Sequence, residues 1–228
     1  MLERISRLEL YDLLIAWFAL SIAFAFIFPQ IFDMSGITTS PLLTLLISFI
    51  LALMTAGIGF AFHEMAHKFT AIRYGFWAEF RRDNVMLVIA VALAALVHVV
   101  FAAPGATMIA GYNITKEQNG KISAAGPLTN LLLCIPFAAC FFAASSISGI
   151  AGILLGLLGS AGLLVNATLA AFNMLPVSVL DGKKVLAWNP GVFAGIFIAA
   201  FGVLIGSYYY VFHLSLFCIE TIYKSKFF

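Results

Sequence analysis

The chain has 228 residues, of which 63% are apolar and only 10% are charged, and its formal net charge is +2. Soluble domains are roughly 45–50% apolar and about 25% charged, so this chain has too few polar side chains to cover a water-exposed surface. The composition therefore excludes an ordinary soluble domain, and the sequence has no basic stripe that would indicate a nucleic-acid partner.

Six apolar blocks follow one another along the chain, and most approach the roughly 20 residues that a helix needs to cross a bilayer. The blocks cover residues 13–28, 41–62, 85–101, 126–145, 149–172 and 191–217. This pattern predicts an all-α polytopic membrane protein with about six apolar segments and five or six spans. No polar stretch is long enough for a separate soluble module. We therefore expect one membrane-embedded domain over residues 1–228, with its core at 41–190 and flanking helices at 13–28 and 191–217.

The basic residues around the first two blocks are distributed unevenly. Arg4 and Arg7 precede the first block and a basic segment at residues 68–84 follows the second, whereas residues 29–40 contain no Lys or Arg. By the positive-inside rule the N-terminus and residues 68–84 are cytoplasmic, and residues 29–40 lie outside. We therefore expect a multi-pass protein of the cell membrane.

The second block runs directly into the sequence His63-Glu64-Met65-Ala66-His67. Residues four apart project from one face of a helix, so two imidazoles with this spacing can share one tetrahedral zinc ion. Glu64 is rotated about 100° from His63 around the helix axis, which places its carboxylate beside the metal. From there it can take a proton from water and later deliver it to a leaving amine. The pattern therefore predicts a zinc peptidase.

A catalytic zinc ion needs a third protein ligand and one open position. Asp181 is the leading candidate, because it follows a proline-interrupted stretch and precedes Gly182, which we expect to permit a turn. Glu220 is the alternative ligand, and His98 and His213 are interpreted as packed polar residues within apolar blocks. An alternative function also stays open: a membrane metal transporter or metal-binding protein would use the same His/Asp cluster without hydrolysis.

Three motifs together resemble the site-2 protease family of intramembrane zinc metalloproteases. They are HEMAH at residues 63–67, GPLTN at 126–130 and NMLPVSVLDG at 173–182. The resemblance implies that His63, His67 and Asp181 bind one zinc ion and that Glu64 is the general base. It also implies that Asn173 contacts the substrate or the transition-state oxygen. Thr129 and Asn130, in the second motif, are interpreted as helix-packing or substrate-side polar groups without a catalytic role.

The segment around Pro104 and Gly105 resembles the extended segment that precedes the second motif in this family. We therefore expect a short membrane-associated strand region there, whose edge binds the substrate. A transmembrane helix must unwind before it is cut, because a helical backbone hides its carbonyls, and a strand edge can pair with the unwound segment. The resemblance thus implies hydrolysis of peptide bonds within or near transmembrane helices of membrane proteins, the reaction of regulated intramembrane proteolysis.

A shared zinc ion constrains the topology, because all of its ligands must lie at one depth. His67 is near the cytoplasmic end of its block, and a single crossing by residues 85–101 would place Asp181 at the opposite side. We therefore predict that residues 85–101 are re-entrant or lie in the interface, so that the chain is back on the cytoplasmic side at residues 119–125. The active site is then expected within the membrane, nearer the cytoplasmic side.

Overall fold

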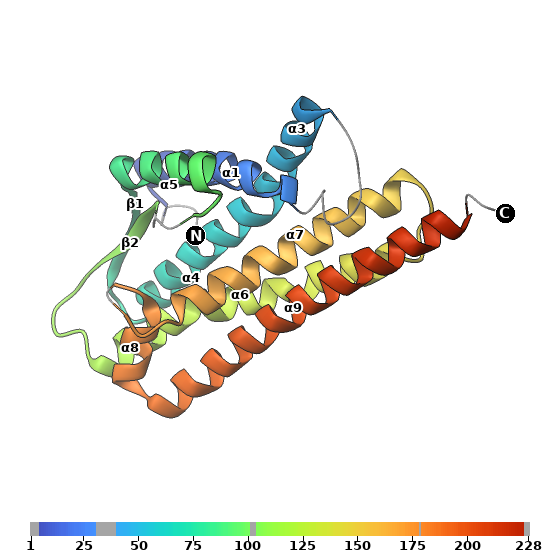
Figure 1. Cartoon of the computed structure of the whole chain (residues 1–228). Helices are drawn as coiled ribbons and strands as arrows, with labels where there is room; N and C mark the ends of the chain where they lie inside the picture. Colours follow the sequence, from blue (N-terminus) through green and yellow to red (C-terminus); the bar gives the residue numbers. More distant parts are fainter. Residues whose placement is uncertain (1–4, 31–39, 101–103, 178, 226–228) are drawn as a thin grey trace.

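The computed structural model describes residues 5–30, 40–100, 104–177 and 179–225, with side chains described as far as Val211 (Figure 1). In chain order its elements are α1 (Arg7–Ile27), α3 (Pro41–Ala52), the π-helical turn η2 (Leu53–Gly57), α4 (Ile58–Arg73), β1 (Trp77–Arg82), α5 (Asn84–Val97), β2 (Gly105–Ala110), α6 (Lys116–Ala144), α7 (Ile150–Asn173), α8 (Asp181–Trp188) and α9 (Pro190–Ser225).

Within the described residues, five helices are long and apolar enough to cross a membrane. They are α1, the continuous helix Pro41–Arg73, α6, α7 and α9 up to Val211. The predicted all-α polytopic membrane protein is therefore confirmed. The third apolar block is the exception: α5 has 14 residues. At 1.5 Å per residue such a helix is about 21 Å long, shorter than the roughly 30 Å of a bilayer's hydrocarbon core.

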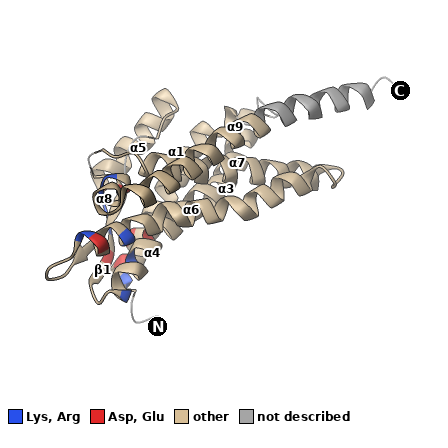
Figure 2. Cartoon of the chain, turned by 90° about the horizontal axis from the view of Figure 1, so that it is seen from below, with Lys and Arg blue, Asp and Glu red and all other residues tan. Residues whose placement is uncertain are grey.

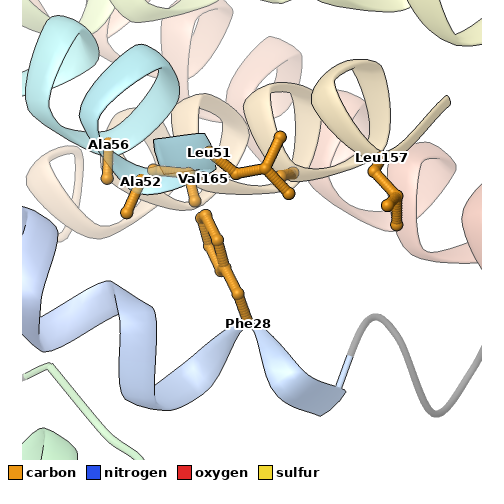
Figure 3. Close-up of a cluster of buried hydrophobic side chains, with 7 residues drawn as sticks. Phe28, Leu51, Ala52, Ala56, Leu157 and Val165 are labelled. Atoms are coloured by element: carbon orange, nitrogen blue, oxygen red, sulfur yellow. The ribbon is translucent and has the colours of Figure 1, made fainter. Parts of the chain in front are cut away.

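Four long helices lie side by side, and a second layer crosses them. Figure 1 shows α4, α6, α7 and α9 running in roughly the same direction, while α1 and α5 lie together across the end of this bundle that carries β1 and β2. A buried apolar cluster joins the layers: the ring of Phe28 points from the end of α1 toward Ala52 and Val165 (Figure 3). The core thus links the N-terminal helix to the helices that carry the motifs.

Charged residues gather at one end of the molecule. Figure 2 shows them around β1, the start of α1 and α8, while the far halves of α6 and α7 carry none. Several are paired: Glu9 forms a fully buried ion pair with Lys68 of α4, and Arg82 lies 3.4 Å from Asp12. Both pairs connect α1 to the region that follows the HEMAH motif, so this end of the molecule is held together by charges as well as by apolar contacts.

Helix α6 begins ten residues before the apolar block at 126–145. Thr115 starts it with a capping box, in which the Thr115 hydroxyl accepts from the Gln118 N–H at 3.2 Å and the Gln118 side chain accepts from the Thr115 N–H at 3.0 Å. These bonds satisfy backbone groups that a helix start otherwise leaves unpaired. The first turns are polar, so hydropathy alone does not detect them.

The strand predicted near Pro104 and Gly105 is present as β2, but it does not stand alone. It pairs antiparallel with β1, and Arg82 is the register partner of Gly105. The end of β1 therefore lies beside the start of β2, so the chain leaves β1 into α5 and comes back to the same place when β2 begins. Such a return is needed if residues 85–101 are re-entrant or lie in the interface, which stays a prediction; residues 101–103 lie outside the described residues. Strand β1 was not predicted, because its sequence resembles a charged connection.

Candidate metal centre

Three side chains converge where α4 meets the start of α8. His63 and His67 lie one turn apart on α4, and Asp181 is the first residue of α8. Oδ2 of Asp181 is 3.3 Å from Nε2 of His63 and 3.2 Å from Nε2 of His67, and all three residues are buried. In the described part of the chain they form the one group of His, Cys, Asp and Glu side chains that could hold a metal ion.

The spacing of these atoms fits a zinc ion. Zinc bonds of about 2.0–2.1 Å at tetrahedral angles place neighbouring ligand atoms about 3.3 Å apart, close to the two distances between Asp181 and the histidines. No metal is needed to explain a hydrogen-bonded His–Asp pair, but here two ring nitrogens face one carboxylate oxygen. If both rings are neutral and carry their protons on Nδ1, three lone pairs point toward one spot, an arrangement that a cation stabilises.

Each imidazole is held at its other nitrogen by an oxygen acceptor. Nδ1 of His63 is 2.6 Å from Oδ1 of Asn130, and Nδ1 of His67 is 2.8 Å from the carbonyl oxygen of Ile122. Such acceptors place the ring proton on Nδ1 and leave Nε2 free to bind a metal. Both partners lie on α6, so this helix orients both histidines.

The residue that holds His63 belongs to a buried chain of amides. Asn130 donates from Nδ2 to the Gly59 carbonyl at 3.1 Å and to Oδ1 of Asn166 at 3.0 Å, and Asn166 donates to the Gly162 carbonyl at 2.9 Å. Both asparagines have 0% exposed surface. The sequence interpretation of Asn130 as a packing or substrate-side group was therefore incomplete. The signal was present: an asparagine inside an apolar block is expensive unless it is paired.

Gly126 makes room for the centre. A Cβ atom at this position would lie 2.5 Å from Nε2 of His67 and 2.6 Å from Nε2 of His63. Any side chain would therefore occupy the space in which these nitrogens meet a ligand. The glycine of the GPLTN motif has a steric role at the candidate metal centre, beyond helix packing.

Asp181 reaches the centre because the chain breaks between two helices. Helix α7 ends at Asn173 and α8 begins at Asp181, as the proline-interrupted stretch predicted. The expected reason for Gly182 was wrong: it lies inside α8, and a Cβ there would collide with the backbone carbonyl of Met174.

Glu64 lies beside this cluster on α4, but its hydrogen-bond partner lies on β2 and not on α6 or α8. Its Oε2 accepts a hydrogen bond from the backbone N–H of Thr107 at 2.9 Å and lies 2.8 Å from the Thr107 hydroxyl. Thr107 is in β2, so the hairpin contacts the predicted general base directly. Nothing in the sequence pointed to Thr107, because one threonine in a six-residue strand carries no local signal.

The other predicted site residues have varied positions. Pro104 and Gly105 stand at the start of β2, and their predicted role in substrate binding stays a prediction. Asn173 donates to the Leu169 carbonyl of its own helix at 2.9 Å, so its predicted contact with substrate also stays a prediction. His98 is not packed as predicted: it is exposed at the C-terminus of α5, in the left-handed conformation. The side chains of His213 and Glu220 lie outside the described residues.

Comparison with known proteins gives one informative match. No family model and no solved structure matches the chain. A protein of Methanocaldococcus jannaschii, named "Putative zinc metalloprotease", is 37% identical over 202 residues, which cover 89% of this chain and 95% of the relative. A match of this extent includes the whole segment from His63 to Asp181, and its printed name agrees with the zinc chemistry expected from the three ligands.

Proposed function

The chain belongs to the family of this zinc metalloprotease of Methanocaldococcus jannaschii, and we propose that it cuts its substrates within the membrane, as site-2 proteases do. The substrates are transmembrane proteins, cleaved within or near their membrane-spanning helices. The observation that carries the proposal is the position of the HEMAH motif. His63, Glu64 and His67 lie in the continuous apolar helix Pro41–Arg73, which is long enough to span a bilayer, and all three are buried.

The side chains present provide the parts of a peptide hydrolase. A zinc ion held by His63, His67 and Asp181 would supply Lewis-acid polarisation of the scissile carbonyl and of water. Glu64 takes the proton from the attacking water and transfers it to the nitrogen of the leaving amine as the peptide bond breaks. We assign Asn173, at the end of α7, to contact with the substrate or the developing oxyanion; its Nδ2 donates one hydrogen bond to the Leu169 carbonyl and carries a second N–H that can donate to such an oxygen.

Strand β2 supports the same proposal from the substrate side. Among the residues that the structure describes, β2 pairs with β1 along one edge only, and the sheet has two strands. The second edge of β2 faces Glu64, since the Thr107 N–H reaches that carboxylate. An unwound substrate segment that starts beside Pro104 and Gly105 can add to this edge through backbone hydrogen bonds, which brings its carbonyls close to the base.

Zinc content and cleavage together test the proposal. We expect the purified wild type to bind zinc and to cleave a single-span substrate, and Glu64→Gln to keep the zinc but lose cleavage. Asp181→Ala is expected to lose both. Cleavage by Glu64→Gln would overturn the assignment of the base. If the wild type cleaves nothing, and Glu64→Gln still binds zinc and transports it into vesicles, the alternative function of a metal transporter would be favoured instead.

We also propose that the centre lies nearer the cytoplasmic side of the cell membrane. Charged residues gather at the end of the molecule that carries β1 and α8 (Figure 2). Arg81 and Arg82 belong to β1, Lys68 follows His67 on α4, and Asp181 is the first residue of α8. Tyr112 lies between β2 and α6 and is 99% exposed, so a label at this position can show on which side of the membrane this end of the molecule lies. In a cysteine-free background, Tyr112→Cys should resist a membrane-impermeant maleimide in intact cells and react after lysis. Labelling in intact cells would place this end outside.

A further inference from the structure

Thr107 contacts Glu64 through three pairs of atoms. Its N–H donates to Oε2 of Glu64 at 2.9 Å, and its hydroxyl lies 2.8 Å from the same Oε2 and 3.1 Å from the Glu64 carbonyl oxygen. Among the described residues, the hydrogen bonds to the Glu64 carboxylate all go to Oε2. One carboxylate oxygen is therefore held by β2, and Oε1 is the oxygen left to accept a proton.

The strand register explains why the Thr107 N–H is available. Thr107 is paired with Phe80 of β1, and the Phe80 N–H points away from β2 to Oε1 of Glu9 at 3.0 Å. In an antiparallel ladder such outward N–H groups mark a non-hydrogen-bonded pair. The N–H groups of Thr107 and, two residues on, Ile109 therefore face the open edge of β2. Since the Thr107 N–H is bonded to Glu64, a substrate strand on this edge would pair with backbone groups on either side of it, including the Ile109 N–H.

We propose that Thr107 is a positioning residue for Glu64, so that the general base and the unwound substrate are aligned by the same strand, β2. This inference rests on the proposed function. A general base must lie within hydrogen-bond reach of the proton that it takes, and a glutamate side chain has several rotatable bonds. The Thr107 N–H donates to Oε2, and the single hydroxyl proton, directed along the shorter 2.8 Å contact, adds a second donor that restricts rotation of the carboxylate. The hydroxyl is the part of this arrangement that a substitution can remove without changing the backbone.

The test uses a shape-matched pair of variants and a matched control. Thr107→Val removes the hydroxyl but keeps the branched shape and the N–H, and Thr107→Ser keeps the hydroxyl. Thr168→Val makes the same change on α7, where the hydroxyl donates to the Leu164 carbonyl of its own helix at 2.7 Å. The rate constant kcat, KM and the zinc content are measured for each full-length protein with a single-span substrate.

We expect Thr107→Val to lower kcat about 10- to 100-fold, as for the loss of one hydrogen bond to a charged group, with KM and zinc content nearly unchanged. Thr107→Ser should recover kcat to within about threefold of wild type, and Thr168→Val should match wild type.

Three results would overturn the positioning role: an unchanged kcat in Thr107→Val, an equal loss in Thr107→Ser, or a raised KM at constant kcat. Each of these leaves the proposed function intact, provided that wild type cleaves and Glu64→Gln does not. A zinc-loaded wild type that cleaves nothing would overturn the proposed function and this inference with it.

Discussion

The two sides of helix α4 are supported in different ways. His63 and His67 face α6 and α8, where their partners are the fully buried Asn130, a backbone carbonyl and the carboxylate of Asp181. Glu64 faces the hairpin of β1 and β2, where its partner Thr107 is half-buried on an open strand edge. One helix thus presents metal ligands to a closed interior and the predicted base to the part of the fold with an unpaired edge.

This difference separates binding the metal from admitting a substrate. The metal side is built from long helices whose polar groups are paired with one another, and such regions open only rarely. A two-stranded hairpin is marginal by itself and depends on anchors outside it. Here the anchors are Glu9, which accepts from the Phe80 N–H, and Glu64, which accepts from Thr107. We therefore expect a substrate to enter on the hairpin side, and the following predictions test how independent the two sides are.

The largest effect is expected at Gly126. Gly126→Ala would place a methyl group 2.5–2.6 Å from Nε2 of both histidines, so we expect zinc binding and cleavage to be lost while the helices remain folded. Zinc content by mass spectrometry and helicity by circular dichroism measure the two effects. Gly195→Ala is the control, because no atom lies within 4 Å of the added Cβ. Full zinc content in Gly126→Ala would show that the three ligand atoms do not converge as described.

The next effect concerns the buried ion pair on the hairpin side. Lys68→Met leaves Glu9 buried without its cation, and breaking a buried pair in this way costs about 3–5 kcal/mol of stability. Thermal unfolding in detergent should show a lower Tm and limited proteolysis a faster cut near the hairpin, with zinc retained. The double variant Glu9→Gln/Lys68→Met should recover part of the loss. Zinc loss in Lys68→Met alone would mean that the two sides are not independent.

The smallest effect is expected in the amide chain behind His63. Asn130→Ala removes the acceptor that orients the ring, and losses of such partners weaken metal affinity about 10- to 100-fold. Asn166→Ala removes a group that contacts Asn130 but neither histidine, so its zinc affinity should fall less. Competition with a chelator of known affinity ranks the variants. Equal losses in both would indicate general destabilisation of the metal side, with no specific role for Asn130.

Local patterns in the sequence were sufficient for the principal residues of the site. The four-residue spacing of His63 and His67 decides that both project from one helix face, whatever the rest of the fold. Asp181 was selected because acidic residues are rare in the apolar part of the chain and this one follows a broken helix. The structure brings these three side chains together as predicted, and the apolar blocks correctly indicated a helical membrane protein.

The limits of these patterns appear where a contact joins distant segments. Asn130 and His63 are 67 residues apart, and Thr107 and Glu64 are 43 apart. Neither residue type nor spacing specifies such a pair, since many polar residues could fill each role. Strand β1 was missed for the same reason: its charged sequence forms a strand only because β2 lies beside it and Glu9 accepts its N–H.

The sequence by itself determined the membrane class, the helix that carries the HEMAH motif and the three candidate ligands. Each depends on composition or on geometry within a few residues, and neither of these depends on how the helices pack. Only the tertiary structure decided which groups orient those ligands, why Gly126 must lack a side chain, and which strand holds Glu64. These depend on how α4, α6, α7 and the hairpin pack, because a hydrogen bond across elements forms only when packing brings donor and acceptor to within about 3 Å of each other.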